Sequence, residues 1–280
     1  MAKQYSNEEI EFLKENAPKF GAQICAEKLN RKVDSVRYKL SRLGICSKRD
    51  KSLTKEDIDN LEFKSSFKEL SLDFSKTNTP KELAYFLGFF WADGYNKPKD
   101  KALVIEITEE DGTVLEPIFM RLATFSIYKR SREGRKPQIT FYYRDEHLFE
   151  FINSLGKYPN STESHEKVLK FIPDEYLLYF LRGLIDGDGS YYLSDKAVQF
   201  NIASSINQDW SYLQYVLKKY GMETTVNKTE SEKGNSSHLR CSNPSKIKAF
   251  LDALYKVKDH IWLDRKYLKA QMILNNNMIK

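Results

Sequence analysis

Two aspartates, Asp93 and Asp188, stand in equivalent places near the ends of two very similar apolar strings. The first string is Phe86–Gly94 (FLGFFWADG) and the second is Leu181–Gly189 (LRGLIDGDG). Each residue of the second string follows its counterpart in the first by 95 positions. A fixed, domain-sized offset predicts two copies of one structural unit. The recurrent pair of carboxylates is therefore the first candidate for chemistry.

The apolar run before each aspartate is long enough to form a buried helix. In the first run, Gly88 and Ala92 are four residues apart and share one helix face. Gly183 and Gly187 repeat this spacing, and faces of such small residues let two helix backbones approach closely. Each aspartate then lies in a last helical turn, where the helix dipole disfavours an anion. If the small faces pack together, the carboxylates meet and must share a proton or bind metal ions.

A glycine ends each string. Gly94 and Gly189 suit the left-handed backbone conformation just past a helix end. The alternative is that two core helices each end in a common Asp-Gly turn and share no function. The matched glycines and the constant offset argue against coincidence.

The two strings resemble the paired motifs of the LAGLIDADG homing endonucleases, in the single-chain form with two repeats, over about residues 80–275. The resemblance implies an α+β fold, in which two pseudo-symmetric αββαββα repeats form a DNA-binding saddle. It also implies metal binding by Asp93 and Asp188, at the eighth motif position. The sixth position is Asp186 in the second string but Trp91 in the first, so it is not the shared acid.

The composition fits a polyanion as partner. The 280 residues carry a net charge of +6, with 30% of them charged. Three scattered cysteines, Cys25, Cys46 and Cys241, indicate a reducing cytoplasm and show no metal-ligand spacing. No apolar run approaches the length of a membrane span, and no signal peptide is visible. We expect a soluble, cytoplasmic monomer that binds double-stranded DNA and needs no protein partner or membrane.

Four regions are predicted along the chain: residues 1–46, 47–79, 80–165 and 166–280. The first should form three short helices, beginning with a capping box at Ser6 and Glu9. It resembles a helix-turn-helix module of the Myb/SANT kind, and the alternative is a small structural domain with a solvated basic helix. Residues 47–79 are predicted to be a linker, and the last two regions are the repeats. The residues expected to contact DNA from the third helix are Arg37, Tyr38, Lys39 and Arg42.

Both repeats show the same predicted order of helix, two strands, helix, two strands and helix. Alternation in the strands leaves polar side chains on the face away from the core, where they could read bases or contact phosphates. The alternative is the ordinary wet face of an antiparallel sheet. The candidates on this face, its rims and the hairpin tips are Lys97, Lys129, Arg130, Arg132, Arg135, Lys136, Gln138, Thr140, Tyr142, Gln199, Asn201, Lys228, Lys233, His238 and Arg240.

The expected reaction is hydrolysis of one phosphodiester on each DNA strand, with Mg²⁺ or Mn²⁺ as cofactor. Asp93 and Asp188 would supply one carboxylate per active site, with the backbone carbonyls of Ala92 and Gly187 as further metal ligands. The resemblance implies cleavage across the minor groove with short 3′ overhangs.

Further active-site residues follow from the resemblance alone. The family places a polar side chain at the end of each repeat's second strand, which gives Glu109 and Ser204 here. It also has a basic residue near the transition state, for which Lys170 and Lys266 are candidates. The mismatch of Glu109 with Ser204 suggests that the two active sites are not equivalent.

Three functional interpretations remain open at this stage. The first is a free-standing or intron-encoded homing endonuclease. The second keeps the scaffold without DNA cleavage, as an RNA-splicing maturase or a DNA-binding regulator. The third is a nicking enzyme, which follows from the unequal residues of the two repeats.

Overall fold

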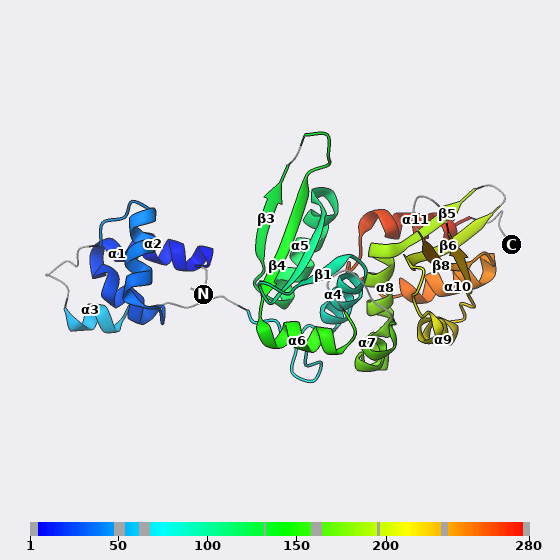
Figure 1. Cartoon of the computed structure of the whole chain (residues 1–280), viewed down its shortest axis with the longest axis horizontal. Coiled ribbons are helices and arrows are strands. Elements are labelled where there is room, and N and C mark those ends of the chain that lie inside the picture. The colour runs from blue at the N-terminus through cyan, green and yellow to red at the C-terminus, as the bar shows by residue number, and fades with distance from the viewer. Residues whose placement is uncertain are drawn as a thin grey trace. The chain divides into compact units, whose positions relative to one another are not determined.

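The computed structural model describes residues 5–47, 54–61, 68–131, 133–157, 164–194, 197–230 and 235–276. The chain divides into two compact units, Met1–Lys68 and Glu69–Lys280 (Figure 1).

The first unit is helical. Its helices are α1 (Asn7–Lys28), α2 (Val33–Arg42) and α3 (Lys55–Asp59). The predicted capping box is present, with Ser6 Oγ accepting from the Glu9 amide and the Glu9 carboxylate accepting from the Ser6 amide. At Gly21 α1 leaves helical geometry (φ 82°, ψ 163°), so it consists of two helical segments. Val36 and Leu40 of α2 pack with them in a core of this unit's own.

The second unit contains both repeats. The elements of the first repeat are α4 (Pro80–Asp93), β1 (Gly94–Lys97), β2 (Ala102–Thr108), α5 (Glu109–Leu122), β3 (Ser126–Arg130), β4 (Gln138–Arg144) and α6 (Glu146–Ser154). Two short helices follow, α7 (Glu166–Phe171) and the 3₁₀ helix η1 (Asp174–Tyr176). The elements of the second repeat are α8 (Leu177–Asp188), β5 (Gly189–Leu193), β6 (Val198–Ser205), α9 (Ser211–Lys219), β7 (Thr225–Thr229), β8 (Ser236–Cys241), α10 (Pro244–Leu254) and α11 (Asp264–Leu274).

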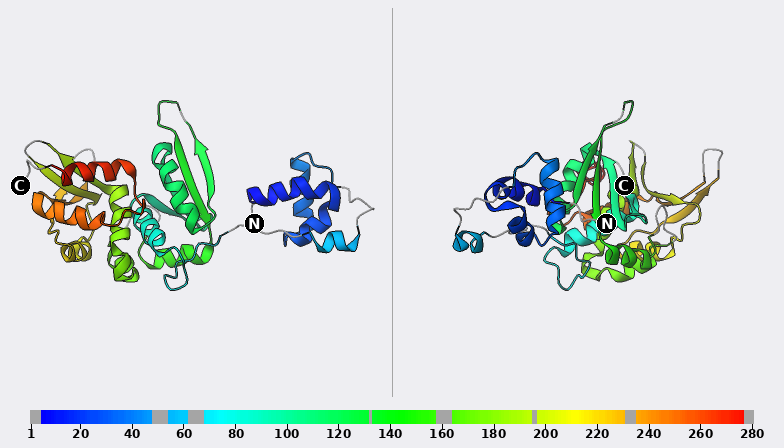
Figure 2. Two further views of the ribbon diagram at one scale, coloured as in Figure 1. Left: turned by 180° about the vertical axis from the view of Figure 1, so that it is seen from behind. Right: turned by 60° about the vertical axis from the view of Figure 1, so that its left-hand side comes forward.

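Each repeat folds its four strands into one antiparallel sheet. The strand orders are β1-β2-β4-β3 and β5-β6-β8-β7, which are equivalent. In β4 and β8 buried and partly exposed residues alternate, so one face of each sheet belongs to the core. Helix α5 packs on the core face of the first sheet and α10 on that of the second (Figures 1 and 2). The predicted two-repeat α+β fold is confirmed.

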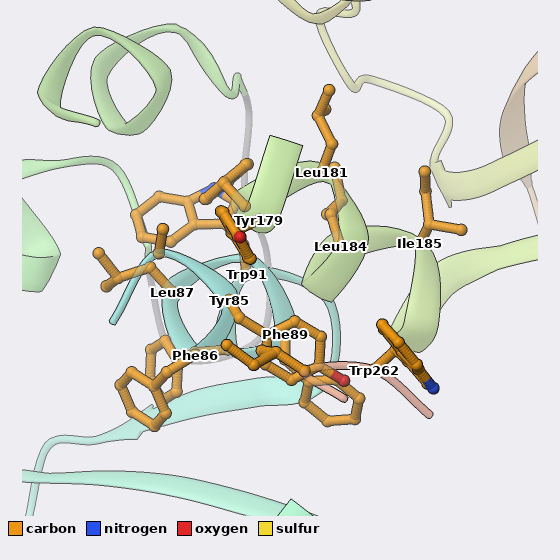
Figure 3. Close-up of a cluster of buried hydrophobic side chains, with 14 of the residues drawn as sticks. Tyr85, Phe86, Leu87, Phe89, Trp91, Tyr179, Leu181, Leu184, Ile185 and Trp262 are labelled. Carbon is orange, nitrogen blue, oxygen red and sulfur yellow. The ribbon is translucent and has the colours of Figure 1, made fainter. Parts of the chain in front are cut away.

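Helices α4 and α8 pack against each other along their small faces, as the glycine spacing predicts. A Cβ atom on Gly88 would lie 2.0 Å from the Phe180 carbonyl oxygen, and one on Gly183 would lie 2.1 Å from the Tyr85 carbonyl oxygen. Only glycine allows backbones this close. Figure 3 shows the large buried side chains around the two helices, with Trp262 from the segment ahead of α11 beside them. The shared core of the two repeats is therefore built on this helix pair.

The glycines after the motif aspartates are needed for a different reason from the one predicted. Gly94 and Gly189 have φ of −80° and −78°, in the extended region rather than the left-handed one. The chain passes directly from helix into strand at these points. A Cβ on Gly94 would lie 2.3 Å from the Phe90 ring, and one on Gly189 would lie 2.6 Å from the Ile185 carbonyl oxygen. Space, rather than backbone conformation, requires glycine at both positions.

Part of the predicted linker belongs to the second unit. Leu70 and Leu72 are buried in its core, and the Leu70 amide donates to the Tyr143 hydroxyl oxygen at 2.8 Å. The division between the units falls at Lys68 and Glu69.

Candidate functional site

The two motif aspartates meet at the ends of α4 and α8. A Cβ atom on Gly187 would lie 2.4 Å from the Ala92 Cβ and 3.2 Å from Oδ2 of Asp93. Gly187 directly precedes Asp188, so the last turns of the two helices touch. The predicted juxtaposition of the carboxylates is therefore seen.

The meeting of the two carboxylates changes their acidity. Burial, and then the negative charge of Asp93, raise the pKa of Asp188 to about 7. Asp93 is more exposed, yet loss of hydration among the neighbouring groups raises its pKa as well. The positive charges of Lys157 and Lys266 oppose both shifts and do not cancel them. The two carboxyl groups therefore bind protons more readily than isolated aspartates do.

A buried lysine lies at the end of each motif helix. Lys266, in the first turn of α11, donates its ammonium protons to the carbonyl oxygens of Ile185 (3.3 Å) and Gly189. Lys157, just past α6, donates to the carbonyl oxygen of Trp91 at 2.7 Å. Burial lowers the pKa of Lys157 to about 8 and also lowers that of Lys266. Lys266 was predicted from the sequence as an active-site residue, and Lys157 was not. The only local signal for Lys157 is its place after Gly156 at a helix end.

An ion pair between the repeats lies beside the lysine of α11. Arg265 donates from Nε and from a terminal nitrogen to the two carboxylate oxygens of Asp111, both at 2.8 Å. Asp111 is in the first turn of α5, and its charge and that of Arg265 both act on Asp93. Sequence reasoning missed both residues, because their partnership spans more than a hundred positions of the chain.

The donor set suits a hard divalent cation in part. The described residues contain no cluster of three or more His, Cys, Asp or Glu side chains placed to hold a metal ion. Asp93 and Asp188 would hold a metal through their carboxylates, and burial, which raises the pKa of both, would be offset by a bound cation. Mg²⁺ accepts one or two carboxylates and completes its shell with water and phosphate oxygens. The carbonyls of Ala92 and Gly187, in the same helical turns, remain predicted ligands.

The other predicted active-site side chains have their own partners. Glu109 begins α5 and accepts from the Lys129 ammonium at 2.7 Å. Ser204 Oγ donates to Gln208 at 3.0 Å. The exposed Lys170 pairs with Glu166 on its own helix at 2.5 Å. The structure thus brings Lys266 to the carboxylates, whereas the contacts of Lys170 are with another part of the repeat.

The outer face of the first sheet carries polar and aromatic side chains. Thr140 of β4 lies between Glu106 of β2 and Tyr128 of β3. Gln138 lies between Thr108 and Arg130 in the same way. The other predicted residues on this face or its rims are Tyr142, whose ring faces the Lys97 ammonium at 5.7 Å, and the exposed Arg135 and Lys136 of the β3–β4 hairpin.

The outer face of the second sheet is a hydrogen-bonded network. Asn201 Oδ1 lies 3.2 Å from His238 Nδ1 and accepts from Arg240 Nε at 3.3 Å. Gln199 on the same strand donates to the Ser242 hydroxyl at 3.4 Å. The predicted side chains therefore share one surface and are held in position by one another.

Two predicted DNA contacts lie on the opposite faces of their strands. Lys129 pairs in register with the buried Ile139, and Lys228 with the buried Ser237. Because strand residues alternate in direction, both lysines point away from the outer face. The predicted contacts Arg132 and Lys233 lie outside the described residues.

The candidate residues of the first unit lie on α2. Tyr38 is 68% exposed, and the guanidinium of Arg42 lies 6.0 Å from its ring centroid. Arg37 is exposed and pairs with Asp34 at 3.4 Å, and Lys39 faces the Tyr5 ring at 5.6 Å. The helix-turn-helix interpretation of this unit remains a prediction.

Comparison with known proteins gives one family match. Residues 175–254 match the model of the LAGLIDADG-like domain. No curated protein sequence matches this chain significantly. No helix of the described residues is long and apolar enough to cross a membrane.

Several solved structures are similar at low sequence identity. I-DmoI in complex with DNA and Ca is 14% identical, with a TM-score of 0.47 over 70% of this chain and 100% of that chain. The I-SmaMI LAGLIDADG homing endonuclease bound to cleaved DNA is 14% identical, with a TM-score of 0.44 over 75% of this chain and 89% of that one. The N-terminal LAGLIDADG domain of DUF199/WhiA is 17% identical, with a TM-score of 0.46 over 65% and 85% of the two chains.

The match lies in the second repeat, and the first repeat has the same motif spacing and the same strand order. Residues 175–254 of this chain are thus similar to the LAGLIDADG-like domain.

Proposed function

We propose that this protein is a site-specific endonuclease that hydrolyses one phosphodiester on each strand of a DNA duplex with the help of divalent metal. The observation that carries this proposal is the meeting of Asp93 and Asp188 at the junction of α4 and α8, with a buried lysine at each helix end. A protein that only binds DNA gains nothing from two adjoining carboxylates, since they repel phosphate and oppose ionisation of each other.

The roles of the side chains follow from their charge and placement. Asp93 and Asp188 would hold divalent metal, which when bound neutralises phosphate oxygens and lowers the pKa of a water molecule. Lys157 and Lys266 place positive charge beside the carboxylates, where it would stabilise the negative charge that builds up on the reacting phosphate. The pKa of about 8 at Lys157 also suits a group that exchanges a proton near neutral pH.

The outer faces of the two sheets would bind the duplex. Gln138 and Thr140 in the first sheet, and Asn201 and Arg240 in the second, are side chains that pair with base edges in the major groove. Exposed basic residues of the β3–β4 hairpin, including Arg135, would contact phosphates. The first strand of each sheet, β1 or β5, begins directly after the motif aspartate that ends α4 or α8. DNA bound by both sheets would therefore pass over the carboxylate pair.

The test is a cleavage assay on a library of long duplexes that includes the DNA flanking the gene, joined without the insertion. Wild-type protein is compared with Asp188→Asn in Mg²⁺, in Mn²⁺ and in EDTA. We expect metal-dependent double-strand breaks at one sequence, absent in the variant and in EDTA. Tight binding without cutting in either metal would contradict the proposal and favour a regulator or maturase. Nicks alone would favour the strand-selective enzyme.

A further inference from the structure

A buried acid in the second motif has no counterpart in the first. Asp186 is fully buried in α8, two residues before Asp188, and Trp91 takes its place in α4. Oδ2 of Asp186 accepts two hydrogen bonds, from the Tyr85 hydroxyl and from the Leu263 amide, both at 2.7 Å. The carboxylate thus joins the two motif helices to the segment that leads into α11.

The bond to Leu263 lies at the start of α11. Leu263 is the N-cap residue of that helix, and its carbonyl oxygen accepts from the Lys266 amide at 3.0 Å. From this first turn the Lys266 ammonium reaches the carbonyl oxygens of Ile185 and Gly189, which flank the motif aspartate. Arg265, next to it, contacts the other repeat through Asp111. Both positive charges that α11 brings to the site therefore depend on how its first turn is fixed.

The first repeat holds its lysine without a buried acid. The Lys157 ammonium donates to the carbonyl oxygen of Trp91, and the Lys157 carbonyl accepts from the Asn96 side chain at 2.7 Å. Trp91 and Asp186 occupy the same motif position. That position therefore secures the lysine segment of each repeat, by a backbone carbonyl in the first and by a carboxylate in the second.

We propose that Asp186 is a positioning residue for Lys266: by holding the Leu263 amide, it sets the start of α11 and so keeps the Lys266 ammonium at the carboxylate pair. The inference rests on the proposed endonuclease function and gives Asp186 no contact with DNA or metal. Because Lys157 is held independently, loss of Asp186 affects the half of the site that Lys266 serves and spares the other.

The experiment measures single-turnover cleavage of the two DNA strands separately, on a duplex labelled at each 5′ end. In Asp186→Ala we expect the ratio of the two strand rates to change by at least about tenfold, so that nicked duplex accumulates. Asp186→Asn keeps an oxygen that can accept from Leu263 and should restore the wild-type ratio. Tyr85→Phe removes the other bond to the same carboxylate and should leave the ratio unchanged.

A second readout keeps the test independent of cleavage. Hydrogen exchange of the first turn of α11 should accelerate in Asp186→Ala, while that of residues 150–157 stays unchanged.

Equal slowing of both strands in Asp186→Ala would overturn the proposal, since it would show that Asp186 only stabilises the helix pair. Unchanged exchange in α11 would overturn it as well. If wild-type protein cuts no DNA, the endonuclease function fails, and the exchange measurement still decides whether Asp186 holds α11.

Discussion

The two repeats share a skeleton but differ in how each brings a buried lysine to the pair of motif carboxylates. In the first, a lysine from the loop after α6, Lys157, bonds to the backbone of α4. In the second, Lys266 comes from a separate helix, α11, whose start is tied to a buried acid. The sheets differ too, because the outer face of the second is a network around Asn201 whereas that of the first is lined with tyrosines and a glutamate.

This comparison shows which features of the two repeats must be the same and which can differ. Close packing of α4 and α8 requires glycine on both sides, so Gly88 and Gly183 are matched. The carboxylates must meet, so Asp93 and Asp188 are matched as well. A lysine can be brought to the carboxylates from different parts of the chain, and under the proposed function the two outer faces would bind different halves of a DNA site. These are the features in which the repeats diverge.

The largest expected effect is loss of one motif carboxylate. Asp93→Asn and Asp188→Asn should each lower the cleavage rate by about 10³-fold, because the asparagine amide cannot supply the negative charge that holds metal. DNA affinity should not fall, since each change removes a charge that repels phosphate. Single-turnover cleavage and filter binding measure the two quantities, and a variant that keeps full activity would show that its repeat has no catalytic carboxylate.

The next effect concerns the shared helix interface. Gly88→Ala and Gly183→Ala should each lower the free energy of unfolding by about 3 kcal/mol or more, since a methyl group would collide with backbone that cannot move aside. Gly134→Ala is the control: its φ of 72° makes alanine strained, but the space around it is open, so the cost should be about 1 kcal/mol. Chemical denaturation gives both values. Equal costs at the three sites would contradict the close packing.

Replacement of the two buried lysines tests whether each of them affects cleavage of one DNA strand more than the other. Lys157→Met and Lys266→Met keep most of the side-chain volume and remove the charge, and each should slow cleavage by about 10²-fold. Because the lysines belong to different repeats, we expect the two variants to slow opposite strands more strongly. Lys170→Met, at an exposed lysine paired with Glu166, should behave as wild type. Equal loss on both strands in both lysine variants would argue that the lysines act on one shared centre.

The smallest effect is a pH dependence of stability in EDTA. The pKa of Asp188 is raised from 3.8 to about 7, so the folded protein keeps a proton that the unfolded chain releases. Stability should therefore fall as pH rises from about 4 to about 7. Asp188→Asn cannot ionise and should be more stable than wild type at pH 8, by ~1–3 kcal/mol after allowance for solvent screening, and equal to it at pH 4.

The stability of wild type and of Asp188→Asn is measured by thermal unfolding across this pH range. The exposed Asp252→Asn serves as the control and should show no such gain. A constant difference between Asp188→Asn and wild type at every pH would contradict a raised pKa at this carboxylate.

Local sequence signals predicted most of the fold and the centre of the site. The small residues four positions apart and the matched aspartates predicted the packed helix pair. The alternation of polar and apolar residues in the strands predicted the outer faces of the sheets. The signals that failed were those that depend on distant partners. No sequence motif marks Lys157, because its place in the site depends on its contact with the distant Trp91. Lys129 was expected on the DNA side, but one step of strand register turns it toward Glu109.

The location of the metal ions in a complex with DNA would show most directly whether Asp93 and Asp188 hold metal. We would crystallise the protein with an uncleavable duplex and Mn²⁺ and record anomalous difference maps. We expect manganese within about 2.2 Å of carboxylate oxygens of both Asp93 and Asp188, with scissile phosphates of the two strands adjacent. A duplex bound across the two sheets with no metal at either carboxylate would contradict this expectation.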